Sequence, residues 1–202
     1  MKDRVSQMFG WAGQRLKVYL TEGKIVKEPL SEELRLSYLG GRGLNSRTLF
    51  DELKPGVNPL SPDNILMVAV GPLTGTAAPA SSRWTVTAQS VLTNGLGDGN
   101  GGGDFAAELK FAGYDQIIFY GRSPKPIYLW IDNDRVELRE ASSLWGKTTW
   151  ETNHLLWKVH GDREIRVLCI GPAGENLVPL SKLFANMTRT GGKGGMGAIM
   201  GS

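Results

Sequence analysis

The sequence predicts an α+β fold: a duplicated, two-half domain of antiparallel β-sheets with helices and pseudo-two-fold symmetry. Three observations support this: alternating runs form hairpins, each hairpin leads into a helical segment, and the same order recurs about a hundred residues later. Antiparallel hairpins interleaved with helices favour this class over a parallel βαβ sheet. We expect residues 1–202 to form one domain with similar halves, roughly 10–120 and 121–202. A chance match between common hairpins and Gly-Pro pairs is the alternative.

In the first half, alternation of apolar and polar residues predicts a hairpin, and two further strands follow it. The hairpin turns at Glu22-Gly23, and Ser31 is placed to cap a helix that has Glu32 and Glu33 in its first turn. A short helix is expected at Asp104–Phe111, with Asp104 as its cap. The expected strands are Arg15–Leu20, Ile25–Glu28, Ile65–Val70 and Arg83–Gln89.

The second half repeats this order, with a hairpin that turns at Asn133-Asp134 and a helix over Thr148–His160. In each half an apolar strand runs into Gly-Pro, and a glycine-rich segment comes later. A further apolar strand is expected just before Gly201-Ser202. The expected strands of the hairpin and of the Gly-Pro unit are Ile127–Ile131, Val136–Arg139 and Ile165–Ile170.

Composition excludes several classes of protein. The lone Cys169 excludes an internal disulfide framework and any cysteine-ligated cluster held by this chain alone. The net charge of +3 is mild and its cations are scattered, so no nucleic-acid partner is indicated. No apolar run approaches the ~18–20 residues of a membrane span, and the first residues do not resemble a signal peptide. We therefore expect no membrane partner and a cytoplasmic location.

The chemistry is expected at the two glycine-rich segments, Gly95–Gly103 and Gly191–Gly197, which read as loops. Glycine lets a backbone approach a ligand closely, and a glycine-rich turn that opens a helix presents free N–H groups to an anion, most often a phosphate. Two such cradles at matching places predict a ligand with two phosphates, or two related ligands. A tight loop without a ligand is the alternative for each.

Familiar nucleotide motifs fit poorly. Gly97, Gly99 and Gly102 have the G-x-G-x-x-G spacing, but no parallel βαβ unit surrounds them. Gly146-Lys147-Thr148 mimics the end of a P-loop, yet residue 141 is Ala instead of the required Gly.

Several polar and aromatic residues near the first segment are candidates for ligand contact. Arg83 could clamp a phosphate through its guanidinium, or be a surface strand residue. Asn100 could offer its amide oxygen to Mg²⁺, or simply tolerate left-handed backbone. Trp84 could flank a planar ring, and the Asp98 carboxylate is unfavourable beside phosphates.

The chain resembles the N-terminal domain of the aldehyde ferredoxin oxidoreductase family, from about Gly10 to Ser202. The most telling stretches are Leu39–Leu44 (LGGRGL), Pro59–Asn64 (PLSPDN), Gly71–Thr76 (GPLTGT), Ala107–Asp115 (AELKFAGYD), Ile170–Val178 (IGPAGENLV) and Gly194–Ser202 (GGMGAIMGS). The resemblance implies two similar halves that carry a bis-molybdopterin cofactor with tungsten or molybdenum, one pterin against each half.

The resemblance also implies roles for individual residues. Arg83 would contact a pterin phosphate and approach a 4Fe–4S cluster that later domains hold. Asn100 and the backbone carbonyl of Thr190 would ligate a Mg²⁺ that bridges the pterin phosphates, and Gly102, Arg189 and Gly192 would line the same cradle. The chain departs from the family pattern at Gly97-Asp98-Gly99 and at Thr190, where Ala is typical. No catalytic residue is expected in these 202 residues.

The resemblance implies an oxidoreductase that oxidises small aldehydes to carboxylic acids and passes electrons through the cluster to ferredoxin. The expected partners are the remaining domains of a parent enzyme, and a homodimer is also compatible. Two alternatives stay open: a family member that reduces a carboxylate or an aromatic thioester, and a stand-alone module that binds a phosphate ligand.

Overall fold

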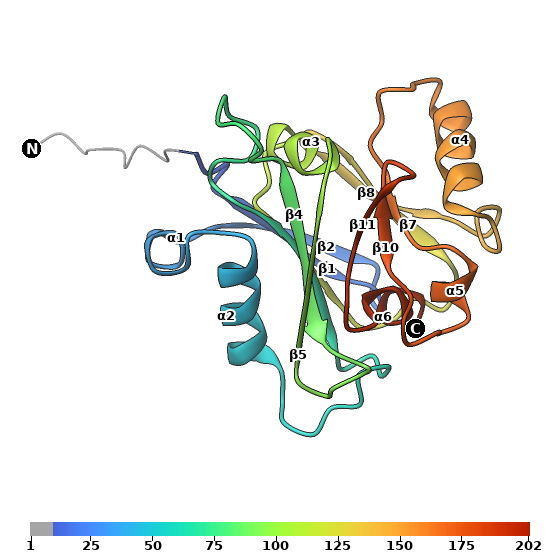
Figure 1. Cartoon of the computed structure of the whole chain (residues 1–202), viewed down its shortest axis with the longest axis horizontal. Helices are drawn as coiled ribbons and strands as arrows, with labels where there is room; N and C mark the ends of the chain where they lie inside the picture. The colour runs from blue at the N-terminus through green and yellow to red at the C-terminus, as the bar shows by residue number, and fades with distance from the viewer. Residues whose placement is uncertain (1–9) are drawn as a thin grey trace, which may run out of the picture.

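The computed structural model describes residues 10–202 and confirms the α+β class (Figure 1). A six-stranded sheet forms the first part of the chain, in the order β2-β1-β6-β3-β4-β5. Its neighbouring strands pair antiparallel except β1 and β6, which pair parallel. The strands are β1 (Gln14–Tyr19), β2 (Lys24–Pro29), β3 (Ile65–Val70), β4 (Arg83–Gln89), β5 (Leu96–Gly102) and β6 (Gln116–Tyr120).

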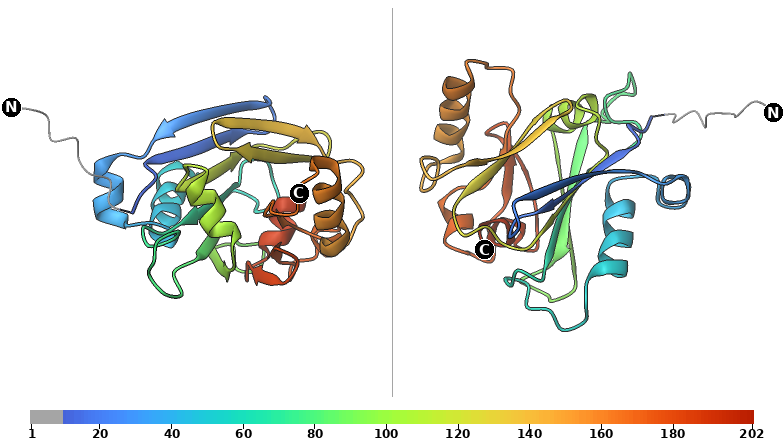
Figure 2. Two further views of the ribbon diagram at one scale, coloured as in Figure 1. Left: turned by 90° about the horizontal axis from the view of Figure 1, so that it is seen from above. Right: turned by 180° about the vertical axis from the view of Figure 1, so that it is seen from behind.

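Two smaller sheets come from the second part of the chain, a two-stranded hairpin and a three-stranded sheet in the order β11-β10-β9. Their strands are β7 (Ile127–Asp132), β8 (Arg135–Glu140), β9 (Leu168–Cys169), β10 (Leu183–Ala185) and β11 (Arg189–Gly191). Figure 2 shows the hairpin β7–β8 beside the hairpin β1–β2 on one side of the molecule. The pseudo-two-fold relation between the halves remains a prediction.

The helices are α1 (Glu32–Tyr38), α2 (Arg42–Glu52), α3 (Phe105–Phe111), α4 (Thr149–His160), α5 (Pro172–Glu175) and α6 (Met196–Gly201). Two of the helices, α1 and α4, begin at side-chain caps. Ser31 caps α1 by accepting a hydrogen bond from the backbone N–H of Leu34. Thr148 and Glu151 form a capping box on α4, which Gly161 ends in the left-handed conformation. Asp104 precedes α3 as expected, but its side chain makes no capping hydrogen bond. Within residues 10–202, no helix has the length and apolar content that a bilayer span would require.

Three expectations about local structure were wrong. Residues 95–103 do not form a loop, because Leu96–Gly102 pairs along its whole length with β4. The strand expected at 165–170 is reduced to Leu168–Cys169, the two residues that pair with β10. The apolar end of the chain is helix α6, in which Met196, Ala198 and Ile199 are buried.

The main core lies between the six-stranded sheet and the second half of the chain. Trp84 of β4 is fully buried at its centre and stacks edge-on against Phe105 of α3. Its indole N–H donates to the carbonyl oxygen of Gly102 at 3.2 Å. Trp84 is therefore a core residue, and the suggestion that it flanks a ligand ring was wrong.

Candidate functional site

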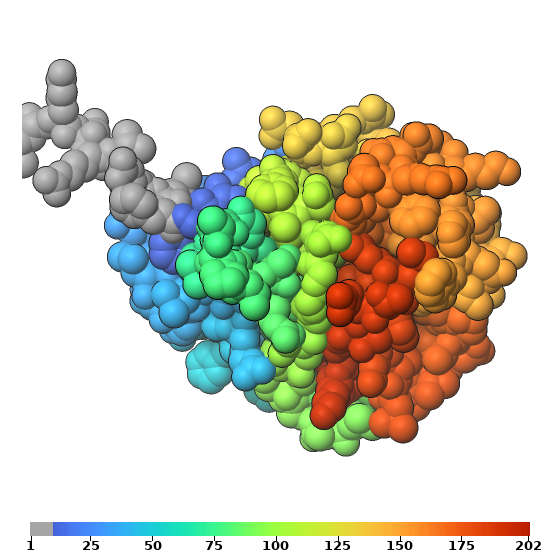
Figure 3. Space-filling view, turned by 45° about the horizontal axis from the view of Figure 1, so that its top comes forward, coloured from blue at the N-terminus to red at the C-terminus, as the bar shows by residue number. Residues whose placement is uncertain are grey.

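Strand β5 lies near the middle of the chain and β11 near residue 190, and the two strands pack directly against each other; we call this contact the seam. A Cβ on Gly99 would lie 2.2 Å from the backbone nitrogen of Gly192, and one on Gly191 would lie 2.9 Å from the carbonyl carbon of Asn100. Real Cβ atoms do not approach this closely, so glycine is what allows the two backbones to touch. Figure 3 shows the two segments meeting at the surface, green against red.

Alternation along β5 divides its residues between the core and the outside. Gly97, Gly99 and Gly101 are buried on the core side, where a Cβ on Gly101 would lie 2.4 Å from the ring of Trp84. Gly102 is different, because a Cβ there would meet only the carbonyl oxygen of Ser82, at 3.8 Å. Its φ is also not in the left-handed region. Neither packing nor backbone conformation requires glycine at position 102, whereas a ligand resting on the backbone would require it.

Arg83 and Asn100 meet on the outer side of this sheet edge. Arg83 is the register partner of Gly102, and Asn100 is the register partner of Thr85. The Nη1 atom of Arg83 donates to Oδ1 of Asn100 at 2.6 Å, and both residues are exposed. An amide oxygen has two lone pairs, so Oδ1 of Asn100 can accept this bond and still face a cation.

Asn100 in β5 and Thr190 in β11 have similar neighbours in their strand pairings. Asn100 precedes Gly101, which pairs with the buried Trp84. Thr190 precedes Gly191, which pairs with the buried Leu183. The two residues that the family resemblance implies as Mg²⁺ ligands therefore each precede a glycine that pairs with a buried side chain, which local sequence alone did not reveal.

The seam carries positive charge that carboxylates do not neutralise. Arg189 is exposed, and its Cγ lies 2.9 Å from the position that a Cβ on Gly103 would take. Gly103 directly follows Gly102, the register partner of Arg83. Over residues 10–202, no Asp or Glu oxygen lies within 4.0 Å of the charged nitrogens of Arg83, Arg189 or Lys193. Unpaired guanidinium groups beside exposed backbone favour a bidentate anion such as phosphate.

The carboxylate of Asp98 is already neutralised. Its Oδ2 accepts from Nε of Arg42 at 2.7 Å and from Nη2 at 2.5 Å, and its side chain is only 9% exposed. Oδ1 lies 3.4 Å from the hydroxyl of Thr87, which also accepts from the buried amide of Asn45. The sequence does not identify Arg42 as the ion-pair partner of Asp98, because the two residues lie 56 positions apart and only the fold brings them together.

Five of the six predicted binding residues lie in β5, in β11 or directly after β11, and Arg83 lies beside them on β4. Their contacts with a ligand remain a prediction. Arg83, Asn100, Arg189 and Thr190 are exposed, Gly102 is half-buried, and Gly192 is buried. Gly192 has a φ of +103°, so the turn after β11 requires glycine there for conformational reasons. In the part of the chain that the structure describes, no group of three or more His, Cys, Asp or Glu side chains could hold a metal ion.

Fold and site together define an α+β domain with a glycine-lined, positively charged seam that suits an anionic ligand. The sequence matches the family model described as "Aldehyde ferredoxin oxidoreductase, N-terminal domain" over residues 15–202. The chain belongs to this family.

Relatives and a solved structure agree with this assignment. The tungsten-containing aldehyde ferredoxin oxidoreductase of Pyrococcus abyssi is 46% identical over 195 residues, which cover 96% of this chain and 32% of that protein. The aliphatic sulfonate oxidoreductase, WOR-like subunit, of Pyrococcus furiosus is 35% identical, with 96% and 33% covered. A chain of the active site complex BamBC of benzoyl coenzyme A reductase, in complex with 1,5-dienoyl-CoA, superposes with a TM-score of 0.93 at 40% identity, covering 96% of this chain and 29% of its own. The chain thus spans about a third of the length of the relatives that it matches.

Proposed function

We propose that this chain is the cofactor-binding N-terminal domain of a longer tungsten enzyme that oxidises aldehydes to carboxylic acids. The observation that carries the proposal is the seam, where Gly102 leaves open space beside Arg83 and Arg189, which lack carboxylate partners among residues 10–202. A bis-molybdopterin fits this arrangement, since its two phosphates need two adjacent cationic cradles.

The chain's own residues would hold the phosphate end of the cofactor. Arg83 and Arg189 would each bind a phosphate, and the exposed backbone at Gly102 would let the ligand approach closely. The amide oxygen of Asn100 and the carbonyl oxygen of Thr190 are hard oxygen ligands of the kind that Mg²⁺ takes alongside phosphates. When bound, the cofactor supplies the redox metal for a two-electron oxidation.

The other components of the reaction would lie outside this chain. A 4Fe–4S cluster would be held by later domains and would pass electrons to ferredoxin. The single Cys169 has its pKa raised to about 12 by burial, so it suits a structural position better than cluster ligation. We place the parent protein in the cytoplasm, consistent with the lack of a bilayer-spanning helix in residues 10–202.

A second candidate function is reduction of an aromatic thioester on the same cofactor-binding fold. The TM-score of 0.93 with a chain of the benzoyl coenzyme A reductase complex favours it. The identity to the tungsten-containing aldehyde ferredoxin oxidoreductases is higher, at 44–46% against 40%. Assays of the full-length protein with an aldehyde and a dye acceptor, and with benzoyl-CoA and a low-potential donor, separate the two.

The binding proposal is tested by Arg83→Gln and Arg189→Gln in the full-length protein, with Arg163→Gln as the matched control. Arg163 is exposed in the connection after α4, and its side chain makes no ion pair within residues 10–202. Both seam variants should lose at least about tenfold in tungsten and pterin content, because a charge-assisted phosphate contact is worth roughly 1.5–3 kcal/mol. Full occupancy in both seam variants, or equal loss in the control, would refute the assignment.

A further inference from the structure

The side chain of Thr190 lies on the outer side of the seam, beside that of Asn100. A glycine follows each residue, and a Cβ on either glycine would strike the same ring: 2.4 Å from Cζ2 of Trp84 for Gly101, and 2.6 Å from Cη2 for Gly191. Successive side chains of a strand point to opposite faces. Asn100 and Thr190 therefore both point away from Trp84 and the core, and both are exposed.

Thr190 also lies beside the open space at Gly102. The contacts of the seam advance along β5 as they go back along β11; the contacting pairs are Gly99 with Gly192, Asn100 with Gly191, and Gly103 with Arg189. Thr190 is therefore opposite Gly101 and Gly102. A Cβ on Gly102 would meet only the carbonyl oxygen of Ser82, at 3.8 Å. The hydroxyl of Thr190 consequently borders the place where a ligand can approach the backbone.

The hydroxyl of Thr190 is not used by the fold. Other threonine hydroxyls donate to backbone carbonyl oxygens, as those of Thr48, Thr74 and Thr76 do at 2.9, 3.0 and 2.7 Å. Among residues 10–202 the hydroxyl of Thr190 makes no such bond and is exposed. It keeps one O–H donor and two acceptor lone pairs available for a ligand.

The charge around Thr190 favours an anion as the partner of this hydroxyl. Arg189 precedes it in the chain, and Arg83 is the register partner of Gly102 on the facing strand pair. Neither guanidinium pairs with a carboxylate among residues 10–202. An anion that these groups attract would accept a short hydrogen bond from the hydroxyl, because an O–H···O⁻ bond is charge-assisted.

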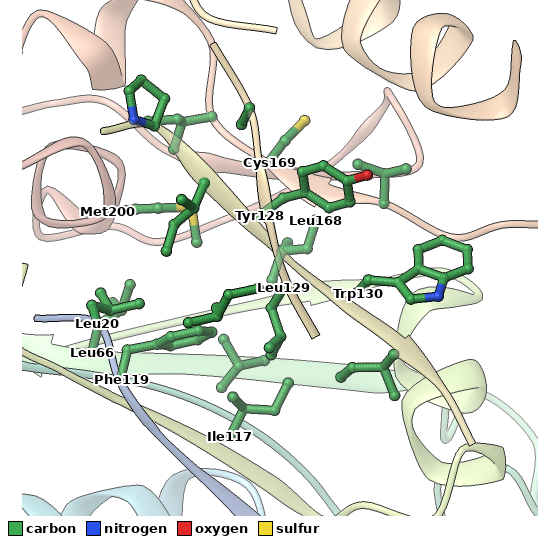
Figure 4. A pocket seen from close by; sticks show the side chains of 18 of the residues that line it. Leu20, Leu66, Ile117, Phe119, Tyr128, Leu129, Trp130, Leu168, Cys169 and Met200 are labelled. Carbon is green, nitrogen blue, oxygen red and sulfur yellow. The ribbon is translucent and has the colours of Figure 1, made fainter. Parts of the chain in front are cut away.

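The large cavity of the domain suits a phosphate less well. It has a volume of about 1000 Å³ and lies between the six-stranded sheet and the second half of the chain. Figure 4 shows Leu66, Ile117 and Phe119 on one side of it, with Leu129 and Met200 facing them. These apolar side chains offer no hydrogen-bond donor to an anion that leaves water. Further phosphate contacts are therefore expected at the seam.

We propose that the side-chain hydroxyl of Thr190 is a further cofactor-binding group, which donates a hydrogen bond to the phosphate that Arg189 binds. Arg189 supplies the charge, and the hydroxyl orients the phosphate, because hydrogen bonds are directional. This contact is separate from the proposed ligation of Mg²⁺ by the backbone carbonyl oxygen of Thr190. The inference rests on the proposed function, since it requires a phosphate-bearing cofactor at the seam.

Thr190→Val and Thr190→Ser in the full-length protein test the role of the hydroxyl. Valine has nearly the shape of threonine without its hydroxyl, whereas serine keeps the hydroxyl. We expect Thr190→Val to release pterin at least about tenfold faster than the wild type, because a hydrogen bond to a charged group contributes that much to affinity. Thr190→Ser should release pterin at close to the wild-type rate. Pterin fluorescence follows the release in guanidinium chloride below the unfolding transition.

The matched control is Thr93→Val, because Thr93 is exposed in the turn between β4 and β5. It should release pterin at the wild-type rate. Calorimetry of the cofactor-free proteins separates binding from folding, since the loss of a solvent-exposed hydroxyl should leave Tm nearly unchanged. A Tm for Thr190→Val more than about 4 °C below that of the wild type would assign the effect to folding and overturn the inference.

Equal release rates in Thr190→Val and the wild type, or equally fast release from both Thr190 variants, would also overturn it. So would selective loss of Mg²⁺ from Thr190→Val with pterin retained, because the hydroxyl would then bind the cation. All these outcomes leave the proposed function standing, since the wild-type protein is loaded with cofactor in each. Wild-type protein that holds neither pterin nor tungsten would refute the proposed function and this inference together.

Discussion

Alanine at Gly101 or at Gly102 separates the two roles that glycine has in β5. A Cβ on Gly101 would lie 2.4 Å from Cζ2 of Trp84, whose ring is fully buried at the centre of the core. Overpacking of this kind costs about 1–3 kcal/mol, and the lower entropy of the unfolded alanine chain offsets roughly 0.4–1 kcal/mol of it. The expected net loss in unfolding free energy for Gly101→Ala is about 1–2 kcal/mol.

Gly102→Ala should have the opposite effect on stability. The new Cβ meets only the carbonyl oxygen of Ser82, at 3.8 Å, so no steric cost arises. The lower entropy of the unfolded alanine chain then stabilises the folded protein by roughly 0.4–1 kcal/mol. For a domain of this size, about 1 kcal/mol shifts Tm by roughly 2–4 °C. Tm should therefore fall by about 2–8 °C in Gly101→Ala and rise by about 1–4 °C in Gly102→Ala.

The assay is calorimetry of the cofactor-free protein together with tungsten and pterin analysis of the protein as purified. We expect Gly102→Ala to lower cofactor content despite its stable fold, because the methyl group occupies the space that a phosphate would need. A thermal midpoint lower in Gly102→Ala than in Gly101→Ala, or full cofactor content in Gly102→Ala, would refute the reasoning.

Three further predictions concern charge and titration. Arg42→Ala should lower cofactor content severalfold because it leaves the carboxylate of Asp98 unneutralised, and adding Asp98→Asn should restore it; failure of this rescue would rule out an electrostatic role. Burial raises the pKa of Cys169 to about 12, so at pH 8 its alkylation, followed by peptide mass spectrometry, should be about 1000-fold slower than in denaturant. Burial, then the charge of Arg139, lowers the pKa of His160, which stacks on Trp130 at 3.8 Å. As the pH falls, His160 therefore binds a proton in the unfolded state before it does so in the folded state. The unfolding free energy, measured with denaturant, should fall as the pH drops below about 6.5, and His160→Gln should lessen that fall.

Much of the fold follows from local sequence pattern. The hairpins, the fully apolar β3 and the capped helix α4 were predicted within a residue or two at each end, because alternation and capping residues act locally. Strand β5 could not be predicted in this way, since its sequence LGDGNGG has little intrinsic preference for a strand. It is extended because β4 pairs with it and because β11 needs a surface without side chains.

The site was predictable only in part. Arg83 and Asn100 were identified as candidates, but their hydrogen bond depends on the pairing of β4 with β5. The matched positions of Asn100 and Thr190, and the ion pair of Arg42 with Asp98, arise from contacts between segments far apart in the chain. No local pattern contains such information.

The central claim is that two phosphates of one cofactor rest on the seam between β5 and β11. Diffraction from crystals of the full-length, cofactor-loaded protein tests this most directly, because tungsten and phosphorus positions can be located in the density. We expect phosphate oxygens within hydrogen-bonding distance of Arg83 and Arg189, with a cation between Asn100 and Thr190. Phosphate density elsewhere in the protein, with none at the seam, would contradict the claim.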